Sequence, residues 1–113
     1  MSWLTTHILD TSLGKPAANV VVVCELEQDA AFKEVARGTT DADGRLRSLF
    51  ADCLSIKPGI YRLSFETGEY FATLQQKTFF PRVQIVFEVL PGEQHYHVPI
   101  LISPFGYSTY RGS

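Results

Sequence analysis

Short stretches of alternating apolar and polar side chains, separated by turn residues, constrain this chain more than any other feature of its sequence. The clearest stretch covers residues 83–90, where Val83, Ile85 and Phe87 fall on one side of an extended backbone. Pro91-Gly92 ends it, as expected of a turn. Further strand-like stretches cover residues 3–9, 19–27, 32–37, 45–50, 60–67, 95–103 and 107–113. Roughly seven or eight short strands with turns between them predict an all-β fold, an antiparallel β-sandwich.

Residues 68–76 break this pattern. Tyr70, Phe71 and Leu74 recur there at helical spacing, which predicts one short helix of about two turns. Phe80-Pro81 is expected to end it, because proline lacks the amide donor and restricts the residue before it. No repeat or change of composition divides the 113 residues, and this length is typical of one domain. We therefore expect a single domain over residues 1–113, too small for a two-domain enzyme with a closing cleft.

Charge and composition exclude several classes of partner. A formal net charge of −2 leaves no basic excess, so neither nucleic acid nor a membrane surface is expected as a partner. No apolar run reaches the roughly 18 residues of a membrane span. The N-terminal residues lack the features of a signal peptide. Cys24 and Cys53 form no C-x-x-C motif and are expected to be free thiols. These observations favour a cytoplasmic protein.

Two histidines in the stretch 95–103 are the first candidates for chemistry. Residues two apart in a strand point the same way, so His95 and His97 share one face. Tyr96 and Val98 take the opposite face, toward the core. Pro99 lies on the histidine face and cannot donate to a ladder, which favours an edge strand or a bulge. A pair of imidazoles can bind a metal ion or transfer protons near neutral pH. By spacing alone, two solvated histidines are an equally good interpretation.

His7 and Arg45 are further candidates. His7 lies in the first predicted strand, where a lone histidine is more often structural. Arg45 follows the turn sequence Asp41-Ala42-Asp43-Gly44, and Arg47 shares its face. A guanidinium there could fork onto a planar carbonyl or carboxylate. A solvated arginine beside the aspartates is the plainer alternative. The turn sequence resembles the start of a calcium loop, but the required glutamate is missing, so we interpret it as a turn.

The C-terminal stretch keeps aromatic and polar residues to its last position, where most chains fray. Its final tetrapeptide Tyr110-Arg111-Gly112-Ser113, the segment His95-Tyr96-His97-Val98-Pro99 and the opening His7-Ile8-Leu9-Asp10 carry a resemblance. The chain resembles the 5-hydroxyisourate hydrolases, the transthyretin-related enzymes of urate breakdown, over nearly its whole length. Further landmarks of the resemblance are Gly14-Lys15-Pro16-Ala17, Asp43-Gly44-Arg45, Tyr61-Arg62, Tyr70-Phe71 and Phe79-Phe80-Pro81.

This resemblance implies a fold, an assembly and a reaction. The implied fold is a transthyretin-like antiparallel β-sandwich of two four-stranded sheets with one short helix. The implied assembly is a homotetramer, a dimer of dimers, whose sites lie in grooves between subunits. The implied reaction is the hydrolytic opening of the six-membered ring of 5-hydroxyisourate. It yields 2-oxo-4-hydroxy-4-carboxy-5-ureidoimidazoline and needs neither a cofactor nor a metal.

The resemblance also implies the residues of the site. The catalytic residues would be His7, Arg45, His97 and Ser113. The substrate-binding residues would be His7, Arg45, Tyr110, Arg111 and Gly112. In this scheme His7 and His97 orient and deprotonate the attacking water, with no assignment of which takes the proton. Arg45 stabilises the developing oxyanion, and Tyr110 and Ser113 form a wall of the pocket.

Three other interpretations stay open. The three histidines could hold a zinc ion with an open position for water, although the resemblance needs no metal and implies that His95 lies behind the reacting groups. A transthyretin-like fold could also carry hydrophobic ligands, but titratable groups in its channel would cost desolvation free energy. A structural sandwich with solvated histidines is the third. Since so small a sandwich fills its interior, any site must lie on an outer face, where a neighbouring subunit could enclose it.

Overall fold

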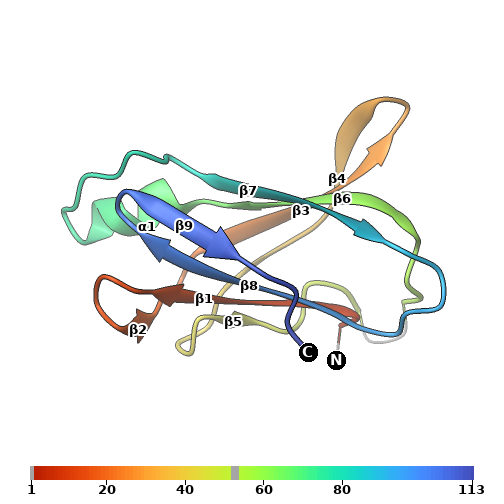
Figure 1. Ribbon diagram of the computed structural model, residues 1–113, viewed down its shortest axis with the longest axis horizontal. Helices are drawn as coiled ribbons and strands as arrows, with labels where there is room; N and C mark the ends of the chain where they lie inside the picture. Colours follow the sequence, from red (N-terminus) through yellow and green to blue (C-terminus); the bar gives the residue numbers. More distant parts are fainter. Residues whose placement is uncertain (1, 52–53) are drawn as a thin grey trace.

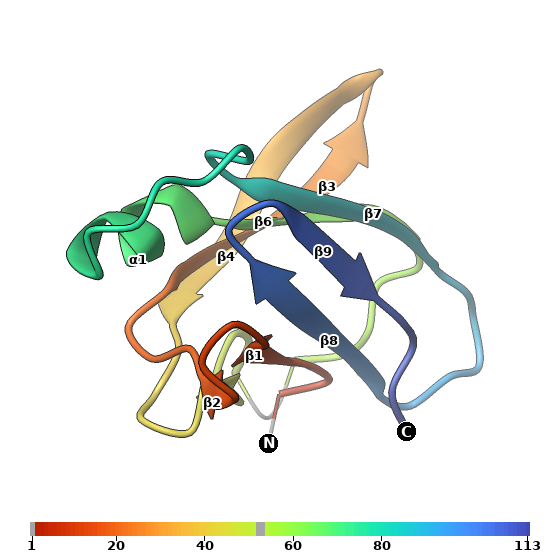
Figure 2. The same cartoon turned by 60° about the vertical axis from the view of Figure 1, so that its left-hand side comes forward.

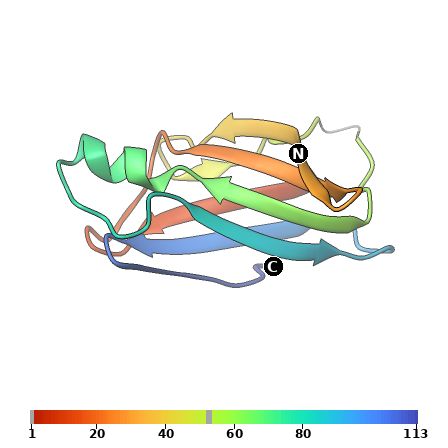
Figure 3. The same cartoon turned by 90° about the horizontal axis from the view of Figure 1, so that it is seen from above.

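Two β-sheets pack face to face in the computed structural model, which describes residues 2–51 and 54–113 (Figures 1 and 3). Within this part of the chain the elements are β1 (Leu4–Asp10), β2 (Lys15–Pro16), β3 (Val21–Gln28), β4 (Ala31–Thr39), β5 (Arg45–Leu46), β6 (Gly59–Phe65), α1 (Thr67–Thr73), β7 (Val83–Val89), β8 (Tyr96–Ser103) and β9 (Gly106–Thr109). The first sheet has the order β2-β1-β8-β9, with β5 also paired to β1, and the second has the order β4-β3-β6-β7. The predicted sandwich with one short helix is confirmed.

Several predicted bounds differ from the observed ones. The predicted strand at 45–50 is reduced to β5, and the predicted strand at 107–113 ends with β9 at Thr109. The predicted helix at 68–76 forms as α1, which begins one residue earlier and ends at Thr73. The ladder between β1 and β8 is parallel, whereas the other ladders between named strands are antiparallel. Alternation along a strand carries no information about the direction of its neighbour, so this pairing was not predictable from the pattern.

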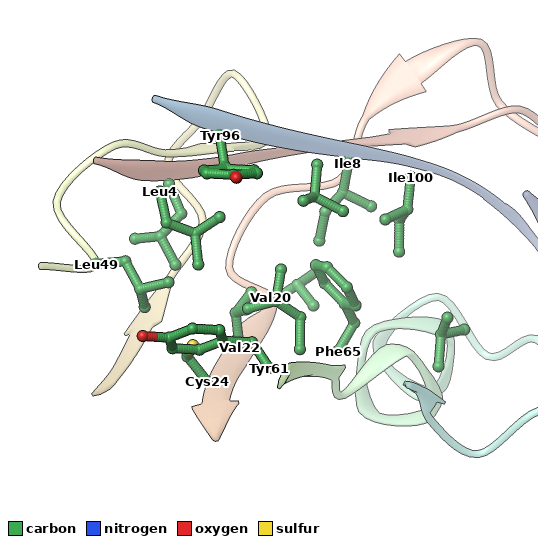
Figure 4. Packing of buried hydrophobic residues seen from close by; sticks show 14 of the residues in the cluster. Leu4, Ile8, Val20, Val22, Cys24, Leu49, Tyr61, Phe65, Tyr96 and Ile100 are labelled. Atoms are coloured by element: carbon green, nitrogen blue, oxygen red, sulfur yellow. The ribbon is translucent and has the colours of Figure 1, made fainter. Parts of the chain in front are cut away.

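Alternating side chains fill the space between the sheets. The buried residues there include Leu4, Ile8, Val22, Phe65 and Ile100 (Figure 4). Cys24 is also fully buried, and burial, with a smaller contribution from Glu25, raises the pKa of its thiol to about 12. A thiol with so high a pKa is unreactive at neutral pH, so Cys24 is a core residue. Cys53 lies outside the described residues.

Pro99 lies in an internal strand, so the expectation of an edge strand or a bulge was wrong. β8 pairs with β1 on one side and with β9 on the other. The backbone N–H of Tyr96 donates to the Trp3 carbonyl at 2.8 Å, so the even-numbered residues of β8 direct their polar groups toward β1. Pro99 therefore faces β9, where the ladder ends one residue away, at the pair Ile100–Thr109. Its missing amide removes no hydrogen bond between β1 and β8.

The helix α1 is tied to the first sheet through a buried carboxylate. Asp10, the last residue of β1, is fully buried and accepts a hydrogen bond from the Tyr70 hydroxyl at 2.7 Å. The backbone N–H of Ser12 donates to its other oxygen at 2.9 Å. The neighbouring Phe71 packs into the core. Among the described residues, none of the helical structure is long and apolar enough to cross a membrane.

Candidate active site

The outer face of the first sheet collects the candidate side chains. The register places His7 of β1 opposite Arg45 of β5 and opposite Pro99 of β8. Two residues earlier on β1, Thr5 lies opposite His97. Residues paired in register project to the same face of a sheet, so His7, Arg45 and His97 all lie on the face away from the core. Three segments far apart in the sequence are thus side by side, as Figure 1 shows for β1, β5 and β8. Figure 2 shows β9 beside β8, with the chain continuing from β9 to the C-terminus.

An open hollow of about 190 Å³ lies on this face. Its lining residues are Thr5, Thr6, Arg45, Arg47, His95, His97 and Ser113. Three of the four residues predicted as catalytic, Arg45, His97 and Ser113, are therefore together at one hollow. His7 is not among the lining residues but borders them, since it is the partner of Arg45 in the sheet.

The C-terminal tail reaches the hollow by following β8. The backbone N–H of Gly112 donates to the His97 carbonyl at 2.8 Å, and the two residues form an isolated antiparallel bridge. A Cβ on Gly112 would lie 2.5 Å from Cδ2 of His97 and 3.2 Å from Cγ of Pro99. Only glycine therefore lets the tail lie against the imidazole. The next residue, Ser113, consequently ends at the hollow.

His97 is held from the side of β1. The Thr5 hydroxyl lies 2.8 Å from Nδ1 of His97 and 3.3 Å from Nε2 of His95, so one hydroxyl joins two imidazoles. Partial burial lowers the pKa of His97, and the charges of Arg45, His95 and His7 lower it further. A hydrogen bond with the Thr5 backbone acts in the opposite direction. The net effect favours a neutral His97 ring near pH 7.

His7 is also favoured in its neutral form. Partial burial is the largest cause that lowers its pKa, followed by the charge of Arg45 and, less strongly, that of Arg47. A hydrogen bond with the Asp43 backbone and the charge of Asp41 raise it, but the sum is a pKa below the ordinary histidine value. A neutral imidazole offers a lone pair to a proton, so both histidines can act as general bases.

The turn before β5 fixes the position of Arg45. The Asp41 carboxylate accepts hydrogen bonds from the backbone N–H groups of Asp43 and Arg45 at 2.8 and 3.0 Å. Gly44 has a φ of 70°, and a Cβ there would lie 2.5 Å from the Ile8 carbonyl oxygen, so the turn presses directly against β1. This geometry confirms the interpretation of residues 41–44 as a turn. It holds Arg45 opposite His7 in the sheet, where the charge of Arg45 lowers the pKa values of His7 and His97.

The structure does not bring Tyr110 and Arg111 to this hollow. Both line a second hollow of about 270 Å³ between β7 and the start of β8. The Arg111 guanidinium lies 4.5 Å from the centre of the Tyr96 ring and 3.5 Å from the Glu93 carboxylate. Within one chain these residues are separate from His97, so their part in substrate binding stays a prediction.

Thr5 and Thr6 line the hollow and were not singled out from the sequence. A signal for Thr5 was present, because it alternates with His7 and so shares its face. Its contact with His97 depends on the parallel pairing of β1 and β8, which the pattern does not contain. Residues 2–51 and 54–113 contain no group of three or more His, Cys, Asp or Glu side chains arranged to hold a metal ion.

Comparison with known proteins gives the context for this geometry. Residues 4–112 match the model of the HIUase/Transthyretin family. The chain is 46% identical over 110 residues to a 5-hydroxyisourate hydrolase of Salmonella dublin, covering 97% of this chain and 80% of the relative. It superimposes on a 5-hydroxyisourate hydrolase of Klebsiella pneumoniae with a TM-score of 0.86 and 42% identity, covering 99% of this chain and all of the other.

A second solved structure shares the fold and contains a bound ligand. Sea bream transthyretin in complex with thyroxine matches with a TM-score of 0.91 and 30% identity, covering 98% of this chain and 95% of that one. The match of the family model spans almost the entire chain, and the TM-scores of the two solved structures show that the fold is shared. The chain belongs to the HIUase/Transthyretin family.

Proposed function

We propose that this protein is a 5-hydroxyisourate hydrolase, which opens the six-membered ring of 5-hydroxyisourate to give 2-oxo-4-hydroxy-4-carboxy-5-ureidoimidazoline. One observation carries the proposal: a hollow on the outer sheet face gathers His97, Arg45 and Ser113, with His7 at its border. The relatives in Salmonella dublin and Klebsiella pneumoniae bear the same name and match nearly the whole chain. In the hydrolysis of a cyclic amide, a neutral imidazole can deprotonate the attacking water and a guanidinium can stabilise the oxyanion that forms.

The reaction follows from these groups. His7 or His97 takes a proton from water, and the resulting hydroxide attacks the ring carbonyl between N1 and C5. Charge develops on the carbonyl oxygen, where the guanidinium of Arg45 is suited to stabilise it. The C–N bond to N1 then breaks, the histidine proton passes to N1, and a carboxylate is left. Ser113 and Gly112 complete the pocket wall, and Tyr110 and Arg111 join it as substrate-binding groups in the assembled enzyme.

The proposal includes a homotetramer, a dimer of dimers, with sites between subunits. The hollow is open on the surface of one chain, so a substrate bound there would stay in contact with water. A neighbouring subunit over this face would exclude water and strengthen the electrostatic interactions in the site. Light scattering after size-exclusion chromatography should give four times the mass of the chain. A monomer that hydrolyses 5-hydroxyisourate at full rate would contradict this part of the proposal.

A carrier function is the main alternative, because sea bream transthyretin binds thyroxine on the same fold. The two histidines and two arginines around the hollow argue against it, since an apolar ligand would leave them desolvated and unpartnered. The remaining parts of the proposal are one hydrolase domain over residues 1–113 and a reducing compartment such as the cytoplasm. The free thiol of Cys24 is compatible with such a compartment.

The decisive experiment follows the near-ultraviolet decay of freshly generated 5-hydroxyisourate. The protein should accelerate this decay, and His97→Asn should abolish most of the acceleration at pH 7. Lys33→Ala, an exposed change on β4 far from the hollow, should leave it intact. Decay no faster than the spontaneous rate would end the enzyme proposal. Full turnover in His97→Asn would remove the assignment of His97 as a base.

A further inference from the structure

The hydroxyl of Thr5 occupies an unusual position between two histidines. Thr5 is only 4% exposed, and its Oγ1 lies 2.8 Å from Nδ1 of His97 and 3.3 Å from Nε2 of His95. The strand β1 holds it there, because Thr5 and His97 are partners in the parallel ladder. A β-branched side chain has few rotamers, so this hydroxyl is fixed in place.

The orientation of the His97 ring is fixed on both of its edges. Thr5 occupies the edge that carries Nδ1, and Gly112 packs against the edge that carries Cδ2. Nε2 lies next to Cδ2 in the ring, so it is the nitrogen left for the hollow. These two contacts fix the orientation of the ring, but they do not decide which of its nitrogens carries the proton of the neutral form.

The Thr5 hydroxyl has only one proton to donate, and it lies between two imidazoles. It can therefore donate to His95 or to His97, but not to both. If Thr5 donates to Nδ1 of His97, then Nε2 carries the ring proton and has no lone pair for catalysis. If Thr5 instead donates to Nε2 of His95, then its oxygen accepts the proton on Nδ1 of His97. The lone pair of His97 is then on Nε2, facing the hollow.

We propose that Thr5 is a positioning residue that, together with His95, holds His97 in the tautomer with its lone pair on Nε2. The inference rests on the proposed function, because it assigns a purpose to that lone pair. The hydrogen bond partner of one imidazole nitrogen sets the protonation of the other. In this arrangement His95 acts on His97 through the Thr5 hydroxyl.

The wild-type protein provides the first test, which needs no variant. A long-range ¹H–¹⁵N spectrum of the histidine rings should show His97 with a protonated Nδ1 and an unprotonated Nε2 at pH 7. A spectrum with the proton on Nε2 would overturn the proposal. This readout does not depend on activity, so it separates the tautomer from the reaction: wild-type protein that fails to hydrolyse 5-hydroxyisourate overturns the proposed function instead.

Thr5→Val provides the second test, because it removes the hydroxyl and keeps the branched shape. We expect kcat to fall by about 10- to 100-fold, which is the usual cost of losing the hydrogen-bond partner that orients a functional histidine. KM should change little, and the His97 spectrum should become a mixture of tautomers. Thr5→Ser should restore both the rate and the spectrum, which a purely structural role of Thr5 would not predict.

A matched control makes the same chemical change away from the hollow. Thr11 follows β1 and donates its hydroxyl to the Ile102 carbonyl at 3.1 Å, so Thr11→Val removes one hydroxyl without touching a histidine. It should keep the wild-type kcat. His95→Phe removes the acceptor of the Thr5 proton and should reproduce the mixed His97 spectrum. A Thr5→Val protein with wild-type kcat and a wild-type spectrum would refute the positioning role.

Discussion

The contact between Gly112 and His97 permits a sharp prediction for the substitution Gly112→Ala. The Gly112 backbone is outside the left-handed region, so alanine carries no conformational penalty there. Its Cβ, however, would lie 2.5 Å from Cδ2 of His97, about 1 Å short of an ordinary carbon–carbon contact of roughly 3.5 Å. Either the imidazole or the tail must therefore move by about 1 Å.

Neither group can move without loss. The hydrogen bond between the Thr5 hydroxyl and Nδ1, at 2.8 Å, holds the imidazole, and the hydrogen bond from the Gly112 N–H to the His97 carbonyl, also 2.8 Å, holds the tail. In the proposed mechanism, movement of the ring misplaces the general base, and movement of the tail misplaces Ser113. A misplacement of about 1 Å costs on the order of 100-fold in rate. We therefore expect kcat/KM of Gly112→Ala to fall by about 100-fold.

The core should be unaffected, because the tail lies beyond the last strand. The assay compares the catalysed decay of 5-hydroxyisourate with the thermal unfolding midpoint, which should stay near the wild-type value. Gly106→Ala is the matched control: its backbone is also outside the left-handed region, and its added Cβ would meet only Ser103 Oγ, at 3.7 Å. Gly112→Ala with wild-type kcat/KM would refute the idea that the tail packs against a working His97.

Four further outcomes are expected. Burial and the charge of Arg45 lower the pKa values of His7 and His97. In the proposed mechanism kcat/KM should therefore be constant near pH 7 and should fall at more acidic pH, where the two imidazoles become protonated. The inflection should lie below 6.5, and one above pH 7 would contradict the assignment. Arg45→Met should lower kcat by about 100- to 1000-fold. Arg45→Lys should recover only part of this loss, since lysine keeps the charge but cannot make two parallel hydrogen bonds. A wild-type rate in Arg45→Lys would argue against bidentate contact. Tyr70→Phe should lower the free energy of unfolding in urea by about 1.5–3 kcal/mol, because the buried Asp10 carboxylate loses a donor, with kcat unchanged. Incubation with a chelator should leave the rate unchanged, and loss of activity restored by zinc would favour the zinc alternative.

Much of the fold followed from local pattern. The alternation at residues 83–90 identified β7, and helical spacing of Tyr70, Phe71 and Leu74 identified α1. Burial of Tyr96 and Val98 opposite the histidines was also predicted and is observed. These predictions succeed because a side chain's face within one strand or helix depends on backbone geometry alone. The extent of β5 was not predictable, because a two-residue strand exists only through its pairing with β1.

The candidate site, too, was predictable from the sequence only in part. From the sequence, the motifs at His7, Arg45, His97 and the last four residues identified the family, and alternation placed His95 and His97 on the outer face. Only the tertiary structure decided that Thr5 contacts His97, that Gly112 packs on its ring, and that Arg111 turns to Tyr96 instead. The physical reason is the distance along the chain: a strand's own residues set its two faces, but its neighbours are chosen by pairing between segments as much as 92 residues apart, as Thr5 and His97 are.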